Sequence, residues 1–93
     1  MPTLTKPTKA RPITEELKRH FRSVGLTIEQ YQKLARRDAF NVWRAAKGYT
    51  YQDCAKRWDI SYNTVFRWGN DRDPQDMACR IIRQFDADCP LVF

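Results

Sequence analysis

The sequence predicts an all-α fold, a compact bundle of four to five helices. Apolar residues recur every three or four positions through most of the chain, which is the spacing that places them on one face of a helix. No stretch of four or more residues alternates apolar and polar side chains, as a half-buried strand would. The 93 residues, of which 42% are hydrophobic, provide one hydrophobic core and leave no room for two. We therefore expect a single helical domain.

The first twelve residues differ from the rest in composition. They contain three prolines and three basic residues but no acidic residue, namely Pro2, Pro7, Pro12, Lys6, Lys9 and Arg11. Proline lacks a backbone N–H and restricts the residue before it, which disfavours both helix and strand pairing. We therefore expect a flexible basic arm over residues 1–13, a folded domain over residues 14–89 and a short tail over residues 90–93.

Two predicted helices follow the arm. Thr14 can cap the first helix, with two glutamates in its first turn, and Gly25 ends it. Thr27, with a glutamine three residues later, matches a capping box at the start of a second helix, which Gly48 ends. The apolar stripe of this helix would consist of Ile28, Tyr31, Ala35, Ala39, Val42, Trp43 and Ala46. As an alternative, Asp38 caps a shorter helix within the same span.

The segment from residue 48 to residue 68 predicts two short helices joined by a tight turn. Thr50 can cap the first of them and Ser61 the second. The inward-facing residues would be Cys54, Ala55, Trp58, Val65 and Trp68. A sharp break is expected at Asp59, and the small side chain of Ala55 allows the two helices to cross closely. This pattern predicts a helix-turn-helix at the centre of the domain.

A last helix is predicted after the helix-turn-helix. Asp73 can cap it, and Pro74 is well placed as its first residue because no hydrogen-bond donor is needed there. The buried stripe would consist of Met77, Ala78, Ile81, Ile82 and Phe85. The helix would end near Asp86, and the apolar tail over 90–93 would fold back on Phe85 or pair with a second copy of the chain.

Several functional classes are excluded by what the sequence lacks. No apolar run exceeds three residues, so we expect neither a membrane span nor a signal-peptide core. Cys54, Cys79 and Cys89 form no CxxC pair and are accompanied by one histidine, His20, so we expect no metal site and no disulfide framework. Reduced thiols are typical of the cytoplasm. Because the glycines are dispersed and nucleophile motifs are absent, we expect no cofactor, no small-molecule ligand and no enzymatic activity.

The charge is unevenly distributed along the chain. Lys and Arg number 17 and Asp and Glu number 11, which gives a net charge of +6. Residues 1–50 carry 11 basic and 4 acidic groups, whereas residues 51–93 carry 6 and 7. A chain with a strongly basic half indicates an anionic polymer, such as a nucleic acid, as its partner.

The helix-turn-helix resembles that of the lambda-repressor-like (Cro-type) transcriptional regulators of phages, prophages and plasmids, over residues 38–86. The matching features are Ala55, the apolar set Cys54, Trp58, Ile60, Val65 and Trp68, the run Ser61-x-x-Thr64-Val65-x-x-Trp68, and the polar loop from Asn70 to Pro74. The family usually has glycine where this chain has Asp59, a residue type that tolerates the left-handed conformation better than most. A homeodomain-like arrangement of three helices is the alternative interpretation.

The resemblance implies that the second helix of the pair lies in the major groove of double-stranded DNA. With Val65 and Trp68 facing inward, the residues left to contact base edges are Ser61, Tyr62, Asn63, Phe66 and Arg67. Asn63 can pair with adenine and Arg67 with guanine, while the two aromatic side chains would lie near thymine methyl groups or sugar edges. The expected contacts to the DNA backbone are Lys47, Gln52, Lys56, Arg57 and Arg72, and the arm residues Lys6, Lys9 and Arg11 would follow a groove.

These expectations combine into a sequence-specific DNA-binding transcriptional regulator, a repressor acting in the cytoplasm of a bacterial cell or a phage-infected host. One small domain buries too little surface on DNA for operator-grade affinity. We therefore expect a homodimer on an inverted-repeat operator, joined by the last helix with the tail or by the first helix. Two alternatives belong to other classes: a recombination accessory or transposase-like DNA-binding module, and an antirepressor or antitoxin that acts through a protein partner.

Overall fold

A computed structural model of the chain describes residues 10–92, which form six α-helices and a short 3₁₀ helix. These are α1 (Glu15–Val24), α2 (Ile28–Lys33), α3 (Arg36–Lys47), α4 (Tyr51–Trp58), α5 (Tyr62–Trp68), α6 (Asp76–Phe85) and the 3₁₀ helix η1 (Pro90–Val92). No strand occurs within residues 10–92, so the predicted all-α class is confirmed. The six α-helices of the described chain exceed the predicted four to five, because one predicted helix is divided into α2 and α3.

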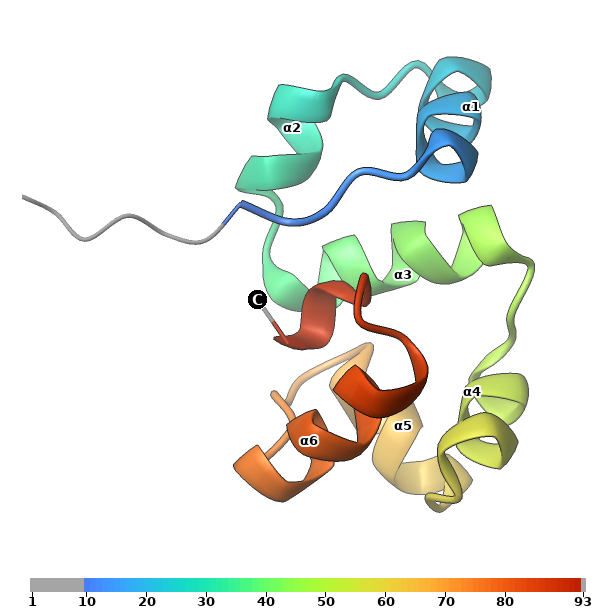
Figure 1. The fold of residues 1–93 in the computed structure, drawn as a ribbon, viewed down its shortest axis with the longest axis vertical. Coiled ribbons are helices and arrows are strands. Elements are labelled where there is room, and N and C mark those ends of the chain that lie inside the picture. Colours follow the sequence, from blue (N-terminus) through green and yellow to red (C-terminus); the bar gives the residue numbers. More distant parts are fainter. Residues whose placement is uncertain (1–9, 93) are drawn as a thin grey trace, which may run out of the picture.

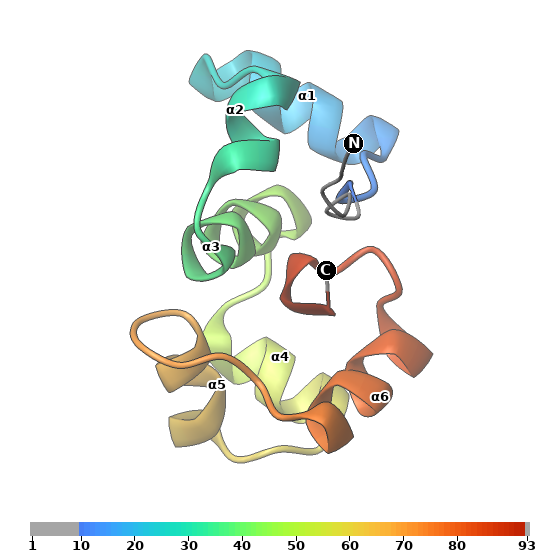
Figure 2. The same cartoon turned by 90° about the vertical axis from the view of Figure 1, so that its left-hand side faces the viewer.

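α3 runs through the middle of the molecule (Figures 1 and 2). α1 and α2 lie on one side of it, and α4, α5 and α6 lie on the other. η1, the last element of the described chain, lies between α3 and α6 and contacts both. This short turn therefore joins α6 to the central helix α3.

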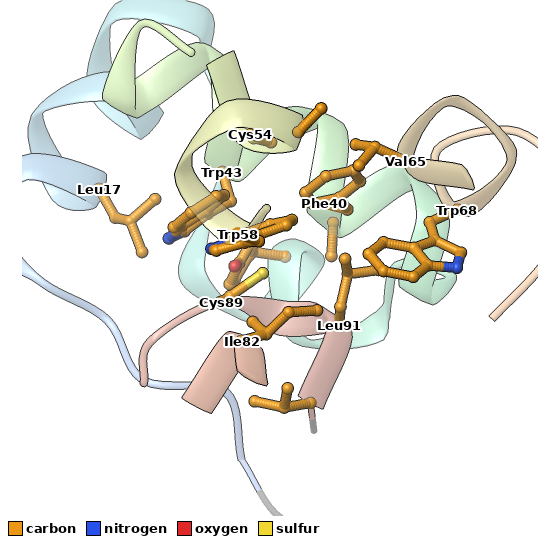
Figure 3. Packing of buried hydrophobic residues seen from close by; sticks show 14 of the residues in the cluster. Leu17, Phe40, Trp43, Cys54, Trp58, Val65, Trp68, Ile82, Cys89 and Leu91 are labelled. Atoms are coloured by element: carbon orange, nitrogen blue, oxygen red, sulfur yellow. The ribbon is translucent and has the colours of Figure 1, made fainter. Parts of the chain in front are cut away.

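Aromatic side chains lie together in the core, among them Phe40, Trp43, Trp58 and Trp68 (Figure 3). The ring of Trp58 is central: its centroid lies 6.3 Å from that of Trp43, 6.1 Å from that of Phe40 and 6.3 Å from that of Trp68. All three tryptophans are buried, so their predicted place in the core is confirmed. Cys54 is buried too, and this burial raises the pKa of its thiol to about 12. It is a protonated core residue at neutral pH, as its position on the apolar face predicts.

Local capping signals define the first helices as predicted. Thr14 caps α1 by accepting a hydrogen bond from the backbone N–H of Leu17, and Gly25 ends it in the left-handed conformation with φ 73°. Thr27 and Gln30 make both hydrogen bonds of a capping box at the start of α2. Each of these signals lies within a few residues of the helix end, so it can be recognised from the sequence without the structure.

The single long helix predicted for residues 27–48 is wrong, because the chain breaks between α2 and α3. Arg11, which precedes both helices in the chain, stabilises the break. Its guanidinium donates to the carbonyl oxygens of Tyr31 (2.6 Å) and Leu34 (2.9 Å). These carbonyls lie where α2 ends and would otherwise need partners further along a continuing helix. The alternative start at Asp38 is wrong as well, since this residue lies in the first turn of α3.

The predicted domain boundaries also change at both ends. The backbone N–H and carbonyl of Arg11 form two hydrogen bonds with the Gln32 side chain, each of 2.8 Å, so this part of the predicted arm is attached to α2. Residues 1–9 lie outside the described chain. Residues 90–92 of the predicted tail are buried in the core of their own domain, which agrees with the folded-back alternative and not with a tail that is free to pair with a second copy.

The last helix begins later and is buried less than predicted. α6 begins at Asp76, two residues after the predicted first residue, and Asp73 does not cap it but forms an ion pair with Arg36 at 3.2 Å. Met77 is 75% exposed and Phe85 is 52% exposed, so neither belongs to the core stripe predicted for them. The helix therefore presents an apolar face to its surroundings.

No helix formed by residues 10–92 is long and apolar enough to cross a membrane. Within the same residues, His, Cys, Asp and Glu side chains form no group of three or more that would hold a metal ion. Cys54, Cys79 and Cys89 are free cysteines.

Candidate nucleic-acid interface

α4 and α5 form the predicted helix-turn-helix, and they lie side by side in the lower part of Figure 1. Thr50 and Asp53 make both hydrogen bonds of a capping box at the start of α4. At the turn, Asp59 adopts the left-handed conformation with φ 55° and ψ 50°, as predicted. The N–H of Ile60 then donates to the carbonyl oxygen of Ala55 over 3.0 Å, a bond that closes helix ends of this type. The turn is thus a specific backbone geometry rather than a loose connection.

α5 has one buried face and one exposed face. Val65 and Trp68 are buried, as their spacing predicts. The exposed side chains are Tyr62, Asn63, Phe66 and Arg67. The side chains of Asn63 and Arg67 form no hydrogen bond or ion pair with any residue of the described chain, so their polar groups are available to a ligand.

Ser61 is exposed as well, but its hydroxyl is engaged within the chain. It accepts a hydrogen bond from the backbone N–H of Thr64 (3.3 Å), and the two hydroxyl groups lie 2.8 Å apart. Ser61 therefore acts as the N-cap of α5, and a base contact from the same hydroxyl would compete with this cap.

Tyr62 and Phe66, here called the aromatic pair, lie one helical turn apart on the exposed face. Their ring centroids are 6.1 Å apart and their planes differ by 23°. Each side chain is 44% exposed. Both rings contact the ring of Tyr51 in an edge-to-face arrangement, with centroids at 6.5 Å and 5.5 Å respectively. One side of the aromatic pair therefore packs against Tyr51 of α4, and the other side is exposed.

Tyr51 is held in turn by α3 and by the end of α5. Its hydroxyl donates to Asn41 Oδ1 over 2.8 Å, and the Arg44 guanidinium lies 3.9 Å from the centre of its ring. Asn41 also accepts a hydrogen bond from Arg44 (2.8 Å) and donates to the carbonyl of Gly69 (3.0 Å). Sequence analysis did not identify these contacts, because no local pattern links α3 to a ring on α4.

The exposed cations near α5 form a strip. Arg72, in the loop after α5, lines two hollows in the surface, one of about 410 Å³ with Arg67 and one of about 280 Å³ with Arg37. We call Arg37, Arg67 and Arg72 the basic strip, although Asp73 lines both hollows and Asp71 lines the second, so acidic side chains lie among these cations. Lys56 and Gln52 are exposed on α4, and neither side chain forms a hydrogen bond or an ion pair within residues 10–92. Arg37 was not predicted, because it precedes the helix-turn-helix and reaches Arg72 only through the fold.

The other two predicted backbone contacts, Lys47 and Arg57, are occupied elsewhere. Lys47 Nζ lies 3.1 Å from a carboxylate oxygen of Glu16 and 3.2 Å from one of Asp88. Arg57 Nε donates to Asp86 over 2.7 Å, and this hydrogen bond raises the pKa of Arg57. The structure does not bring these two cations to the exposed face of α5. They hold the C-terminal segment against the rest of the fold.

Of the three basic residues predicted for the arm, Arg11 alone lies within the described chain. The guanidinium of Arg11 is used at the end of α2, where it also lies 5.7 Å from the centre of the Tyr31 ring. Lys6 and Lys9 lie outside the described residues.

Comparison of the chain with protein-family models, with curated proteins and with solved structures finds no match. The resemblance to Cro-type regulators therefore stays a prediction from the residues of the helix-turn-helix.

Proposed function

We propose that this protein is a sequence-specific DNA-binding transcriptional regulator that inserts α5 into the major groove of double-stranded DNA. The observation that carries the proposal is the exposed face of α5, where Asn63 and Arg67 have no partner in the described chain and stand beside two exposed aromatic rings. Asparagine pairs well with adenine and arginine with guanine in that groove. Side chains of these types, placed on a helix after a tight turn, are suited to reading base edges.

Contacts to the DNA backbone would come from the basic strip and from α4. Arg72 lines one hollow with Arg67 and another with Arg37, and Lys56 and Gln52 are exposed on α4. Such contacts position a protein on DNA without reading its sequence. Three cations outside the base-reading face, Arg37, Lys56 and Arg72, would each contribute about −0.9 to the slope of log K against log salt.

We further propose that the protein acts as a homodimer on an inverted repeat, as a repressor, and that α6 supplies the interface. Met77 and Phe85 are exposed and Ile81 is partly buried between them, four residues from each, so the three form one stripe. If two copies of α6 pack antiparallel about a two-fold axis, Met77 of one copy faces Phe85 of the other, and the two Ile81 side chains meet at the axis. The buried residues 90–92 are not available for this role.

Selection of bound duplexes from a random library tests the proposal directly. We expect a defined consensus with inverted half-sites centred about 34–36 Å apart. Affinity for the selected duplex should fall with increasing salt, because bound phosphates release counterions. Retention of no duplex, or binding that does not depend on salt, would refute the proposed function.

A further inference from the structure

We propose that Tyr62 and Phe66 recognise the C5-methyl group of a pyrimidine base in the major groove, that of thymine or of 5-methylcytosine. This inference rests on the proposed function, since it requires α5 to lie in that groove. It goes further by choosing the methyl group over the sugar edge as the target of the aromatic pair and by assigning a positioning role to Tyr51.

The chemistry of the exposed ring surface limits what it can bind. The Phe66 ring has no polar atom and therefore cannot form a conventional hydrogen bond with a base edge or a phosphate. Among the groups that bases present in the major groove, the C5-methyl group of thymine is apolar, whereas the others are hydrogen-bond donors or acceptors. A ring placed against this methyl group removes apolar surface from water on both molecules.

The aromatic pair is ordered before any ligand arrives. Tyr51 packs edge-on against both rings, and its own ring is held by the hydroxyl contact to Asn41 and by the guanidinium of Arg44. Side chains that are already fixed lose little conformational entropy on binding. A contact as small as one methyl group can therefore contribute to affinity.

The charges around the aromatic pair favour DNA over an apolar protein surface as the ligand. Asn63 and Arg67 are exposed on α5 together with the aromatic pair, and the side chains of these two residues form no hydrogen bond or ion pair within the described chain. An apolar protein surface would leave these polar groups unpaired when it buried them, which is costly. The edges of DNA bases offer both an apolar methyl group and partners for these polar groups.

The test uses the full chain and the duplex obtained by selection. Each thymine of the site is replaced in turn by deoxyuridine, which lacks only the methyl group and keeps the same hydrogen-bonding edge. We expect binding to weaken about three- to fivefold at one or more positions in each half-site, the ratio that corresponds to about 0.8 kcal/mol for one buried carbon group. At the same position, 5-methylcytosine should bind more tightly than cytosine.

Substitutions then assign the effect to the aromatic pair. In Phe66→Ala or in Tyr62→Ala, the ratio of thymine to deoxyuridine affinity should fall to about one at the sensitive position. Ile28→Ala is the matched control, since Ile28 is 46% exposed on α2 and belongs to neither proposed interface. It should keep the ratio of the unsubstituted protein. If the deoxyuridine penalty persists in both aromatic variants, the methyl group is recognised by another residue and the proposal is overturned.

Gly69→Ala tests the positioning role of Tyr51 without removing any ring. A Cβ at Gly69 would lie 2.5 Å from Tyr51 Oη and 2.6 Å from its Cε1, so the ring would have to shift. The backbone of Gly69, with φ −87°, accepts alanine without strain. We expect a reduced thymine-to-deoxyuridine ratio in a variant whose helical content by circular dichroism is unchanged. An unchanged ratio would overturn the role assigned to Tyr51.

The outcomes separate this inference from the function on which it rests. If the protein selects a consensus and binds it tightly but does not distinguish thymine from deoxyuridine at any position, the inference fails and the proposed function stands. A consensus without thymine in the half-sites, together with equal affinity for 5-methylcytosine and cytosine at every cytosine of the half-sites, has the same consequence. If no duplex is retained, both fail.

Discussion

Asp59 turns the chain between α4 and α5 with a positive φ of 55°. Most L residues are strained in this region, because Cβ approaches the carbonyl oxygen, whereas Asp and Asn tolerate it and glycine is free to adopt it. Asp59 is the sole non-glycine residue with positive φ within residues 10–92. The orientation of α5 relative to α4 thus depends on having, at this one position, a residue that accepts a positive φ.

We therefore expect Asp59→Val to destabilise the fold by about 1–2 kcal/mol, because a β-branched residue fits the left-handed region poorly. Asp59→Gly should change the free energy of unfolding by less than about 1 kcal/mol, since relief of strain is offset by the greater freedom of glycine in the unfolded chain. Urea denaturation of the three proteins measures both values. Equal stability of the valine variant would mean that the turn is not left-handed.

A second prediction at the residue scale separates base contacts from backbone contacts. Arg67→Ala should weaken binding to the preferred site by about 1–3 kcal/mol and relax the preference at one base pair. Arg72→Ala should weaken binding to all duplexes alike and reduce the salt slope by about one unit. Arg22→Ala, which removes an exposed cation on α1, is the control and should change neither quantity. Identical losses for Arg67→Ala and Arg72→Ala on specific and random DNA would contradict the role of α5 as the reading helix.

At the scale of the elements, α4 packs on α5, and the sequence predicts that the small side chain of Ala55 allows the two helices to cross closely. Ala55 is buried, and its carbonyl closes the end of α4 through the N–H of Ile60. Ala55→Leu should therefore cost about 1–3 kcal/mol by overpacking. Ala45→Leu makes the same exchange at an exposed position of α3 and should change stability by less than about 0.5 kcal/mol. Thermal unfolding and DNA binding of both variants check this, and a stable, fully binding Ala55→Leu protein would show that the helices do not meet there.

Helix ends were predictable where the signal lies within a few residues of the end. Thr14, Thr27, Thr50 and Ser61 each accept a hydrogen bond from the backbone N–H three residues ahead, so a short stretch of sequence contains both partners. The break between α2 and α3 was not predictable in this way. It is held by Arg11, 20 and 23 residues before the carbonyls that it contacts, and the apolar periodicity runs across the break.

At the candidate interface too, features set by residues close in sequence were predictable, and features set by residues far apart in sequence were not. The exposed face of α5 follows from the spacing of Val65 and Trp68, and sequence analysis identified its residues for that reason. The support behind this face joins Tyr51 to Asn41 and Arg44 of α3, which is a tertiary contact without a local signature. The partners of Lys47 and Arg57 were missed likewise, because their carboxylates lie far along the chain.

At the scale of the whole molecule, the segment after α6 connects the two sides of the bundle. The indole N–H of Trp58 donates to Asp86 over 2.7 Å, and that of Trp43 donates to Asp88 over 3.3 Å. Leu91 follows and is almost completely buried. Leu91→Ala should therefore destabilise the fold by about 2–5 kcal/mol, the range observed for large-to-small exchanges in cores. Val24→Ala, at an exposed position, should cost less than about 1 kcal/mol in the same denaturation experiment.

The proposed dimer gives a prediction at the same scale. Phe85→Asp places a charge on the exposed stripe of α6, so it should leave folding intact and separate the two copies. We expect sedimentation at micromolar concentration to show a dimer for the unsubstituted chain and a monomer for the variant. An unsubstituted chain that is monomeric both free and on DNA, with one protein per site, would refute the dimer.

The position of η1 has a consequence for the order in which the domain can fold during synthesis. Chains emerge from the ribosome from the N-terminus onward, and α1 to α6 all precede the residues that fill the space between α3 and α6. Until residues 86–92 have emerged, the indole groups of α3 and α4 lack their carboxylate acceptors and the core lacks Leu91. We expect nascent chains stalled before this point to remain sensitive to protease, and chains extended beyond it by a linker to become resistant in one step.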